Sequence, residues 1–197
     1  MIKLGTVRHP VRGTLATVAI AALATGAAVA VPAQASPLGA EGSSRCATAW
    51  GSLPEASKAW TAAAVQNVRT GRHGCYDRLV IDLGGSKPTG YRVGYVKTVT
   101  ADGSGAPVST RGGAVLQIVV NAPAYDGAGR PTYRMKNQRE LSTVAEYDTF
   151  RQVAWGGSFE GQTTLALGVR ARLPFQTQVL TGPGNTTRLV IDVAHSW

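Results

Sequence analysis

The residues best equipped for chemistry lie together in one short stretch, Val68–Arg78. This stretch holds three arginines, a histidine, a tyrosine and an aspartate within eleven residues. Arginine binds carboxylates through two parallel hydrogen bonds, so the stretch could contact an anion or a wall muropeptide. Its glycines and its cysteine fit a disulfide-pinned hairpin turn with a solvated rim, which is the simpler interpretation. The candidate ligand contacts are Arg69, Arg72, His73 and Tyr76, with Trp155 as a further one.

A catalytic unit is hard to assemble from the other reactive residues. After residue 35 the histidines are His73 and His195, and no histidine motif typical of zinc enzymes is present. Residues 156–160 approach the G-x-S-x-G motif but have Glu160 in place of the last glycine. A carboxylate pair for glycoside cleavage could come from Glu140, Glu146, Asp148 and Glu160. We expect no catalytic residue, no metal and no cofactor, and we keep a carboxylate-based hydrolase as an alternative.

Short strands are the main elements available to position these residues. Apolar and polar residues alternate in eight runs, separated mostly by turn clusters such as 84–88 and 101–105. The expected strands span 65–70, 78–83, 91–99, 114–120, 150–155, 163–169, 175–180 and 188–193. Segment 121–147 is expected to be an irregular crossing loop that is functional or covers an end of the core, with a helical turn over 137–144. We therefore expect an all-β sandwich of about eight short, mainly antiparallel strands, with at most short helical turns.

One pentapeptide, Arg-Leu-Val-Ile-Asp, occurs twice, at 78–82 and at 188–192. In each copy the arginine and the aspartate face one side of the strand, and the leucine and isoleucine face the other. If the two strands are antiparallel neighbours, each arginine lies opposite the other aspartate, as Arg78 with Asp192 and Arg188 with Asp82. Such exposed pairs contribute about 0.2–1 kcal/mol each, so they would set register more than stability.

The region before the first expected strand contains two tryptophans, Trp50 and Trp60. Ser52 and Glu55 between them have the spacing of a capping box, which predicts a short helix over 53–59. We expect the two tryptophans to form a lid packed on the core, with a sugar-stacking platform as the alternative.

The start of the chain has the features of a secretory signal peptide. Basic residues precede an apolar run over 14–31, and the sequence Ala-Gln-Ala at 33–35 supplies a small-residue cleavage site. We expect a signal peptide over 1–35, a flexible leader over 36–45, and one folded domain over 46–197. After removal of the signal peptide we expect a secreted protein without a stable membrane span, with association to the cell wall as a further expectation.

Charge and cysteine content agree with export. The chain has 20 basic and 11 acidic residues, and three basic ones lie in the signal peptide, so the remainder carries a formal charge of +6. Its basic residues are scattered, which favours wall polymers or lipid head groups over nucleic acid as anionic partners. Cys46 and Cys75 are expected to form a disulfide in an oxidising compartment. A closed loop of about 30 residues would contribute roughly 3–4 kcal/mol.

Several short segments of the chain, taken in order, resemble the AMIN-like domain of secreted actinobacterial proteins. The similarity rests on their order and spacing over residues 65–195, since no single piece is specific. The pieces are 68–73, 76–82, 91–96, 102–105, 157–161, Gly168, Pro174-Phe175 and 188–195.

The resemblance implies a β-sandwich related to the AMIN domain, which is found attached to cell-wall amidases and secretion-pore proteins. There AMIN domains bind peptidoglycan and direct localisation. No amidase segment lies within these 197 residues, so we expect no amidase chemistry. The expected function is a non-catalytic envelope module that contacts peptidoglycan or another anionic wall glycan. The alternatives are a protein-interaction module that presents a sheet edge to an envelope protein, and a carboxylate-based hydrolase.

Overall fold

The computed structural model describes residue 46 and residues 48–61 and 63–197 of the chain. The expected signal peptide and leader lie outside the described residues. Among the described residues there is no α-helix, and none of them forms an apolar helix of membrane-spanning length. The strands are β1 (Glu55–Ser57), β2 (Val65–Arg72), β3 (Tyr76–Gly84), β4 (Tyr91–Val96), β5 (Val99–Thr100), β6 (Pro107–Val108), β7 (Ala114–Val120), β8 (Phe150–Phe159), β9 (Gln162–Val169), β10 (Phe175–Thr181) and β11 (Thr186–Ala194).

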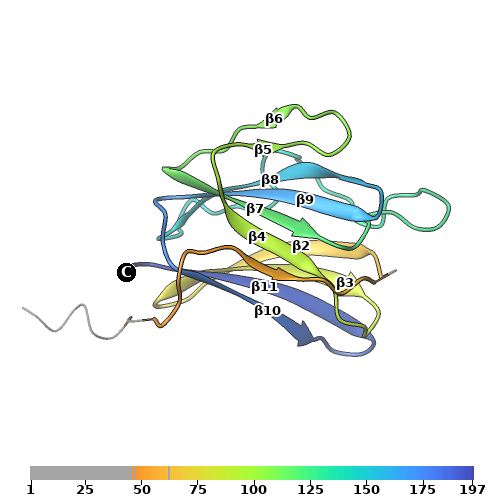
Figure 1. Cartoon of the computed structure of the whole chain (residues 1–197), viewed down its shortest axis with the longest axis horizontal. Coiled ribbons are helices and arrows are strands. Elements are labelled where there is room, and N and C mark those ends of the chain that lie inside the picture. The colour runs from red at the N-terminus through yellow and green to blue at the C-terminus, as the bar shows by residue number, and fades with distance from the viewer. Residues whose placement is uncertain (1–45, 47, 62) are drawn as a thin grey trace, which may run out of the picture. The chain divides into compact units, whose positions relative to one another are not determined.

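Two antiparallel sheets form the sandwich, and Figure 1 shows them stacked face to face. Sheet A has the order β10-β11-β3-β2, and sheet B has the order β1-β4-β7-β9-β8. The β5–β6 ribbon lies beyond sheet B, on the side away from sheet A. The expected all-β sandwich is thus confirmed. Seven of the eight expected strands match one strand each, and the run over 91–99 divides into β4 and the start of β5.

The core lies between the two sheets and follows from the alternation in the sequence. In β3, Leu79, Ile81 and Leu83 are fully buried, and each such side chain contributes roughly 1.5–3 kcal/mol. Sheet B faces them with fully buried aliphatic and aromatic side chains, which are Leu116, Ile118, Phe150, Leu165 and Leu167.

The repeated pentapeptides form the two central strands of sheet A, as antiparallel neighbours. The register of β3 and β11 places Arg78 opposite Asp192 and Asp82 opposite Arg188, as expected. The Arg78–Asp192 ion pair forms, with 2.7 Å between Nε and Oδ1. It is not the exposed pair that we expected, because the Asp192 side chain is only 1% exposed.

The second expected pair, Arg188 with Asp82, does not form. Asp82 instead accepts two hydrogen bonds from Arg69 of β2, at 2.8 and 3.0 Å, and Arg188 donates to a backbone carbonyl. The neighbouring strand β2 explains this asymmetry. Asn67 lies opposite Asp82, and Arg69 reaches the same carboxylate. Opposite Arg78, β2 carries Gly71, which has no side chain to compete.

The segment Gly51–Ser57 closes one side of the sandwich. The carbonyl of Gly51 accepts a hydrogen bond of 2.8 Å from the N–H of Phe175, the first residue of β10. Strand β1 pairs with β4. Glu55 Oε2 also accepts a 2.7 Å hydrogen bond from the N–H of Thr177. The expected helix over 53–59 is therefore wrong, because the free edge of β4 provides strand partners and Glu55 bonds to β10 rather than capping a helix.

Segment 121–147 closes the opposite side of the sandwich. The N–H of Leu141 donates to β8 at 2.8 Å, and the carbonyl of Pro123 accepts from β2 at 2.7 Å. Tyr133 is buried in the core. The segment therefore covers the core, as one of the two expectations stated, and residues 137–144 form a hydrogen-bonded turn rather than a helix. The two segments contact the edges of sheet A at Phe175 and Val65, and β10 and β2 remain its edge strands.

Candidate functional site

The stretch that carries most of the expected contacts forms the turn between β2 and β3. His73 N–H donates to the carbonyl of Tyr76 at 3.0 Å, which makes the hairpin turn. Cys75 in this turn is bonded to Cys46, which confirms the expected disulfide. The bridge ties the chain before β1 to the end of sheet A, so the side chains around it have a fixed support.

An aromatic cluster, defined as Trp50, His73, Tyr76 and Arg78, lies beside this disulfide. His73 stacks on Tyr76 with 4.5 Å between ring centroids and 22° between planes. Trp50 meets the same ring edge-on at 5.7 Å, and the Arg78 guanidinium lies 5.2 Å from its centroid. His73 is exposed, and the other three side chains are half-buried. Such rings offer apolar area to a sugar ring, while the Arg78 guanidinium is held in its ion pair with Asp192.

The other expected contacts do not belong to this cluster. Arg69 is engaged in its ion pair on the outer face of sheet A. Arg72 points to the end of the sandwich, where its Nε lies 3.0 Å from Asp148. Trp155 is on β8 in sheet B and packs against the core and Tyr133, with ring centroids 5.9 Å apart. Of the five expected contacts, the structure brings only His73 and Tyr76 together.

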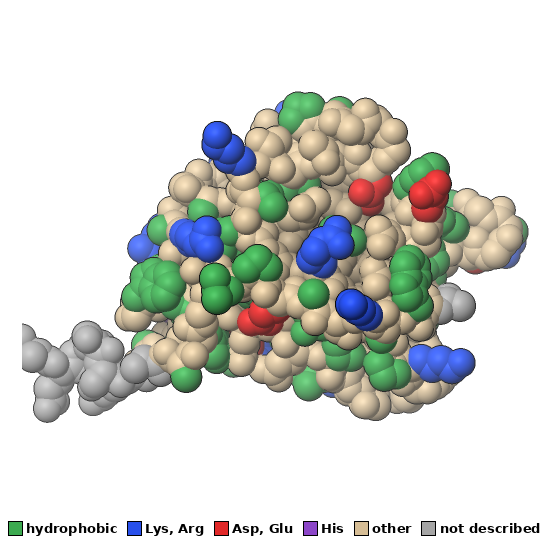
Figure 2. Space-filling model, viewed as in Figure 1, with side chains coloured by type: hydrophobic (Ala, Val, Ile, Leu, Met, Phe, Trp, Pro, Cys, Tyr) green, Lys and Arg blue, Asp and Glu red, His purple; other side chains and the backbone are tan. Residues whose placement is uncertain are grey.

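A second pair of aromatic side chains lies exposed near the β8–β9 turn. Trp60 is 61% exposed and Phe159 is 53% exposed. Figure 2 shows hydrophobic side chains at this end of the molecule, on the right of the view. The expected lid is therefore wrong for Trp60, which does not pack on the core.

A buried carboxylate joins the two sheets at the disulfide end of the sandwich. Asp77 in β3 is fully buried. Its Oδ2 accepts hydrogen bonds from the N–H groups of Thr149 and Phe150, at 2.6 and 3.0 Å, and its Oδ1 lies 3.1 Å from His195 Nε2. Because β3 belongs to sheet A and Phe150 begins β8 of sheet B, this one side chain holds the two layers together.

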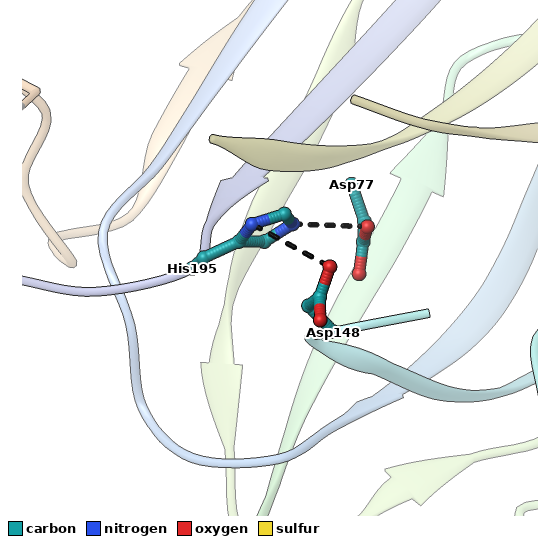
Figure 3. A group of neighbouring side chains, drawn as sticks. All are labelled: Asp77, Asp148 and His195. Carbon is teal, nitrogen blue, oxygen red and sulfur yellow. Dashed lines mark hydrogen bonds and ion pairs between the residues drawn. The ribbon is translucent and has the colours of Figure 1, made fainter. Parts of the chain in front are cut away.

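His195, just after β11, lies between two carboxylates, as Figure 3 shows. Its Nδ1 is 3.8 Å from Asp148 Oδ2, the oxygen that also accepts from Arg72. Its backbone N–H donates to the carbonyl of Cys75 at 2.9 Å. The result is a chain of polar contacts from the buried Asp77 through His195 and Asp148 to the exposed Arg72.

The donor set of this group resembles a metal site or an acid–base pair. Ligand atoms of Asp77, Asp148 and His195 lie within 4.8 Å of one another. However, both oxygens of Asp77 already accept hydrogen bonds, and the Arg72 guanidinium lies against Asp148. No hydroxyl group of the described residues is hydrogen-bonded to the His195 ring. The group is therefore best described as a clamp between the layers. Neither His195 nor Asp77 is among the contacts expected from the sequence.

We expect Arg72 to control the titration of Asp148. The hydrogen bond from Arg72 holds the pKa of Asp148 below its ordinary value. A lowered pKa means that the ionised carboxylate stabilises the fold above its unfolded-state pKa and that this contribution disappears as the pH falls through the folded-state value. In the Arg72→Gln variant the Asp148 pKa should rise, which carboxyl-carbon NMR measures directly. An unchanged Asp148 pKa in that variant, with Arg134→Gln as the control, would contradict the assignment.

The fold and the site together define a small, disulfide-bonded β-sandwich module that presents aromatic and arginine side chains beside its disulfide. The AMIN-like domain family matches residues 63–195, well over half of the chain, and the protein belongs to this family. The resemblance stated from the sequence is thereby confirmed, and membership points to a module related to the cell envelope. Comparisons with curated proteins and with solved structures gave no significant match.

Proposed function

We propose that this protein is a secreted, non-catalytic binding module of the cell envelope that contacts peptidoglycan or another anionic wall glycan through the aromatic cluster. AMIN-like membership supports the envelope setting. The disulfide supports an oxidising compartment outside the cytoplasm.

The observation that carries the proposal is the stack of His73 on Tyr76, with Trp50 and Arg78 against the same ring. Three rings at one partly exposed place can contact the apolar face of a sugar, and the Arg78 guanidinium, which is ion-paired with Asp192, supports the Tyr76 ring. Tyr76 follows the disulfide-bonded Cys75 and is the first residue of β3, so its backbone is fixed before a ligand binds. Little conformational entropy is therefore lost on ligand binding.

Binding rather than catalysis is favoured by the state of the carboxylates at this end of the molecule. Asp77 is buried and hydrogen-bonded, and Asp148 is ion-paired with Arg72. Asp148 is one of four candidate carboxylates for a hydrolase pair; of the other three, Glu140 is ion-paired with Arg111, and Glu146 and Glu160 are exposed. A carboxylate that acts on a glycosidic bond must reach its substrate, and Asp77 has no exposed surface.

A pull-down with purified sacculi tests the proposal. The wild-type protein should be retained at low salt, and the His73→Ala and Trp50→Ala variants should each lose most of this retention because the stacking surface is removed. The Trp60→Ala and Phe159→Ala variants are matched controls, since they remove exposed aromatic side chains at the β8–β9 end. Circular dichroism should show that all four variants are folded.

Two outcomes of this experiment would refute the proposed function. One is a wild-type protein that is not retained by sacculi at low salt. The other is an equal loss of retention in the two variants of the aromatic cluster and in the two controls.

A further inference from the structure

A groove opens on the outer side of sheet B, where β4 ends and β7 begins. Its volume is about 630 Å³, which lies in the range of small-ligand sites. The end of β4 forms one wall of the groove, and the chain over 108–113 forms a second wall. Arg172, between β9 and β10, completes the lining of the groove. The polar and aromatic lining side chains are Tyr95, Lys97, Thr98, Ser109, Thr110 and Arg172.

The charge of this groove is positive and uncompensated. Lys97 and Arg172 line it, and no aspartate or glutamate is among its lining residues. Neither cation forms an ion pair with a described residue, whereas five other arginines of the described part do. Figure 2 shows several Lys and Arg side chains on the left-hand part of this face.

Arg172 is held in place by groups that leave its charge unneutralised. Its Nε and a terminal nitrogen donate to the hydroxyl and the carbonyl of Ser52, at 3.2 and 2.9 Å. Its guanidinium lies 5.1 Å from the centroid of the Tyr95 ring. The Tyr95 hydroxyl is itself fixed, because it donates to the carbonyl of Leu173 at 2.8 Å and accepts from the same residue's N–H at 3.0 Å. A cation fixed in this way loses little entropy when it binds an anion.

The opposite wall is held just as closely against β9. Gly113 N–H donates to the carbonyl of Val169 at 2.9 Å. Gly112 has a φ of 123°, and a Cβ there would lie 2.3 Å from the same carbonyl oxygen, so only glycine permits this approach. The groove is therefore a preformed feature of the fold.

An exposed aromatic side chain lies next to the cationic end of the groove. Trp197 is 71% exposed, and its indole N–H donates to the carbonyl of Arg172 at 3.1 Å. An exposed indole held on the backbone of Arg172 offers an apolar face to a sugar near this end of the groove.

We propose that this groove is a second binding site, which takes an anionic saccharide. Its carboxylate or phosphate is held between Lys97 and Arg172, its hydroxyls contact Ser109 and Thr110, and a sugar ring packs on Trp197. The inference extends the proposed glycan binding from the aromatic cluster to a site on the other sheet.

Calorimetric titration of the full domain tests the site with three soluble probes. Trigalacturonate carries carboxylates, a short poly(glycerol phosphate) carries phosphates, and chitotriose is neutral. We expect at least one anionic probe to bind at low salt and chitotriose to bind far more weakly. The Lys97→Gln/Arg172→Gln variant should bind the anionic probe at least tenfold more weakly, because two charged contacts are lost.

A matched variant separates a built site from general charge attraction. Lys87→Gln/Arg134→Gln removes the same charge from two exposed cations that line no part of this groove and form no ion pair with a described residue. It should change the affinity by less than about twofold at moderate salt. Equal weakening in both double variants, or binding of chitotriose as tight as that of the anionic probes, would overturn the inference.

NMR places the ligand within the molecule. On addition of the anionic probe that binds, the indole N–H signal of Trp197, assigned with the Trp197→Phe variant, should shift in the wild type and not in Lys97→Gln/Arg172→Gln. A ligand that shifts only the Trp50 indole signal would locate binding at the aromatic cluster and overturn the second site. Failure of both anionic probes to bind would do the same.

Sacculi retention distinguishes this inference from the proposed function. If wild-type protein is retained and the groove variant is retained equally well, while the soluble anionic probes do not bind, the second site fails and the proposed function stands. If the soluble probes bind in the groove but sacculi retain nothing, the groove stands and the wall-binding function fails.

Discussion

Replacing Asp77 with alanine is expected to lower the free energy of unfolding by about 3–5 kcal/mol. The change removes a buried acceptor and leaves three donors without a partner, which are the backbone N–H groups of Thr149 and Phe150 and the ring of His195. Each buried donor left unpaired costs roughly 1–3 kcal/mol. Urea unfolding followed by tryptophan fluorescence should show a lower midpoint with an unchanged slope.

The Asp77→Asn variant makes this expectation more specific. Asparagine keeps the shape and one acceptor oxygen, but its amide nitrogen must face either the backbone N–H groups or the histidine. We therefore expect a smaller loss than for alanine, of roughly 1–3 kcal/mol. Glu146→Ala, at an exposed position without a hydrogen-bond partner among the described residues, should stay within about 0.5 kcal/mol. If Asp77→Ala loses no more than Glu146→Ala, the clamp between the sheets does not exist.

The clamp also shows where sequence reasoning stopped early. Antiparallel pairing of β3 and β11 is the arrangement in which the arginine of each repeated pentapeptide lies opposite the aspartate of the other. The same register, extended by a few residues, places Asp77 opposite Val193 and brings His195 beside it on the core side. The Asp77–His195 contact therefore follows from the register of the repeat, as do its outward-facing charges.

Other parts of this end of the molecule could not be read from the pattern. Asp148 follows a long segment without periodicity, so nothing in the sequence places it next to Arg72. The strand that follows, β8, has two irregularities in its pairing with β9. They shift the alternation that would otherwise assign a face to Trp155, which the structure packs on the core side.

The strands themselves were predictable because the period-two pattern is strong wherever one face is buried. Leu79, Ile81 and Leu83 illustrate this, since all three are fully buried as expected. The short segment at Glu55 was not predictable in this way. Its local capping-box pattern lost to the free edge of β4, a tertiary partner that no local pattern reveals.

Removing the disulfide, as Cys46→Ser/Cys75→Ser, is expected to lower the free energy of unfolding by roughly 3–4 kcal/mol. The two cysteines are 29 residues apart, and the loop between them contains β1 and β2. Without the bridge the unfolded chain gains the entropy of that loop. The contact of Trp50 with Tyr76 also loses the covalent link between Cys46 and Cys75, which holds the two segments together.

The disulfide therefore links the stability of the sandwich to the proposed binding surface. Calorimetry of the double variant, and of the wild type with and without reductant, should show the same large decrease in unfolding temperature. Below that temperature the variant should remain folded yet bind sacculi more weakly, because Trp50 is no longer held against the ring that His73 covers. An unfolding temperature unaffected by reductant would show that the bridge does not stabilise the domain. Full sacculi retention by the folded variant would show that binding does not need Trp50 to be held in place.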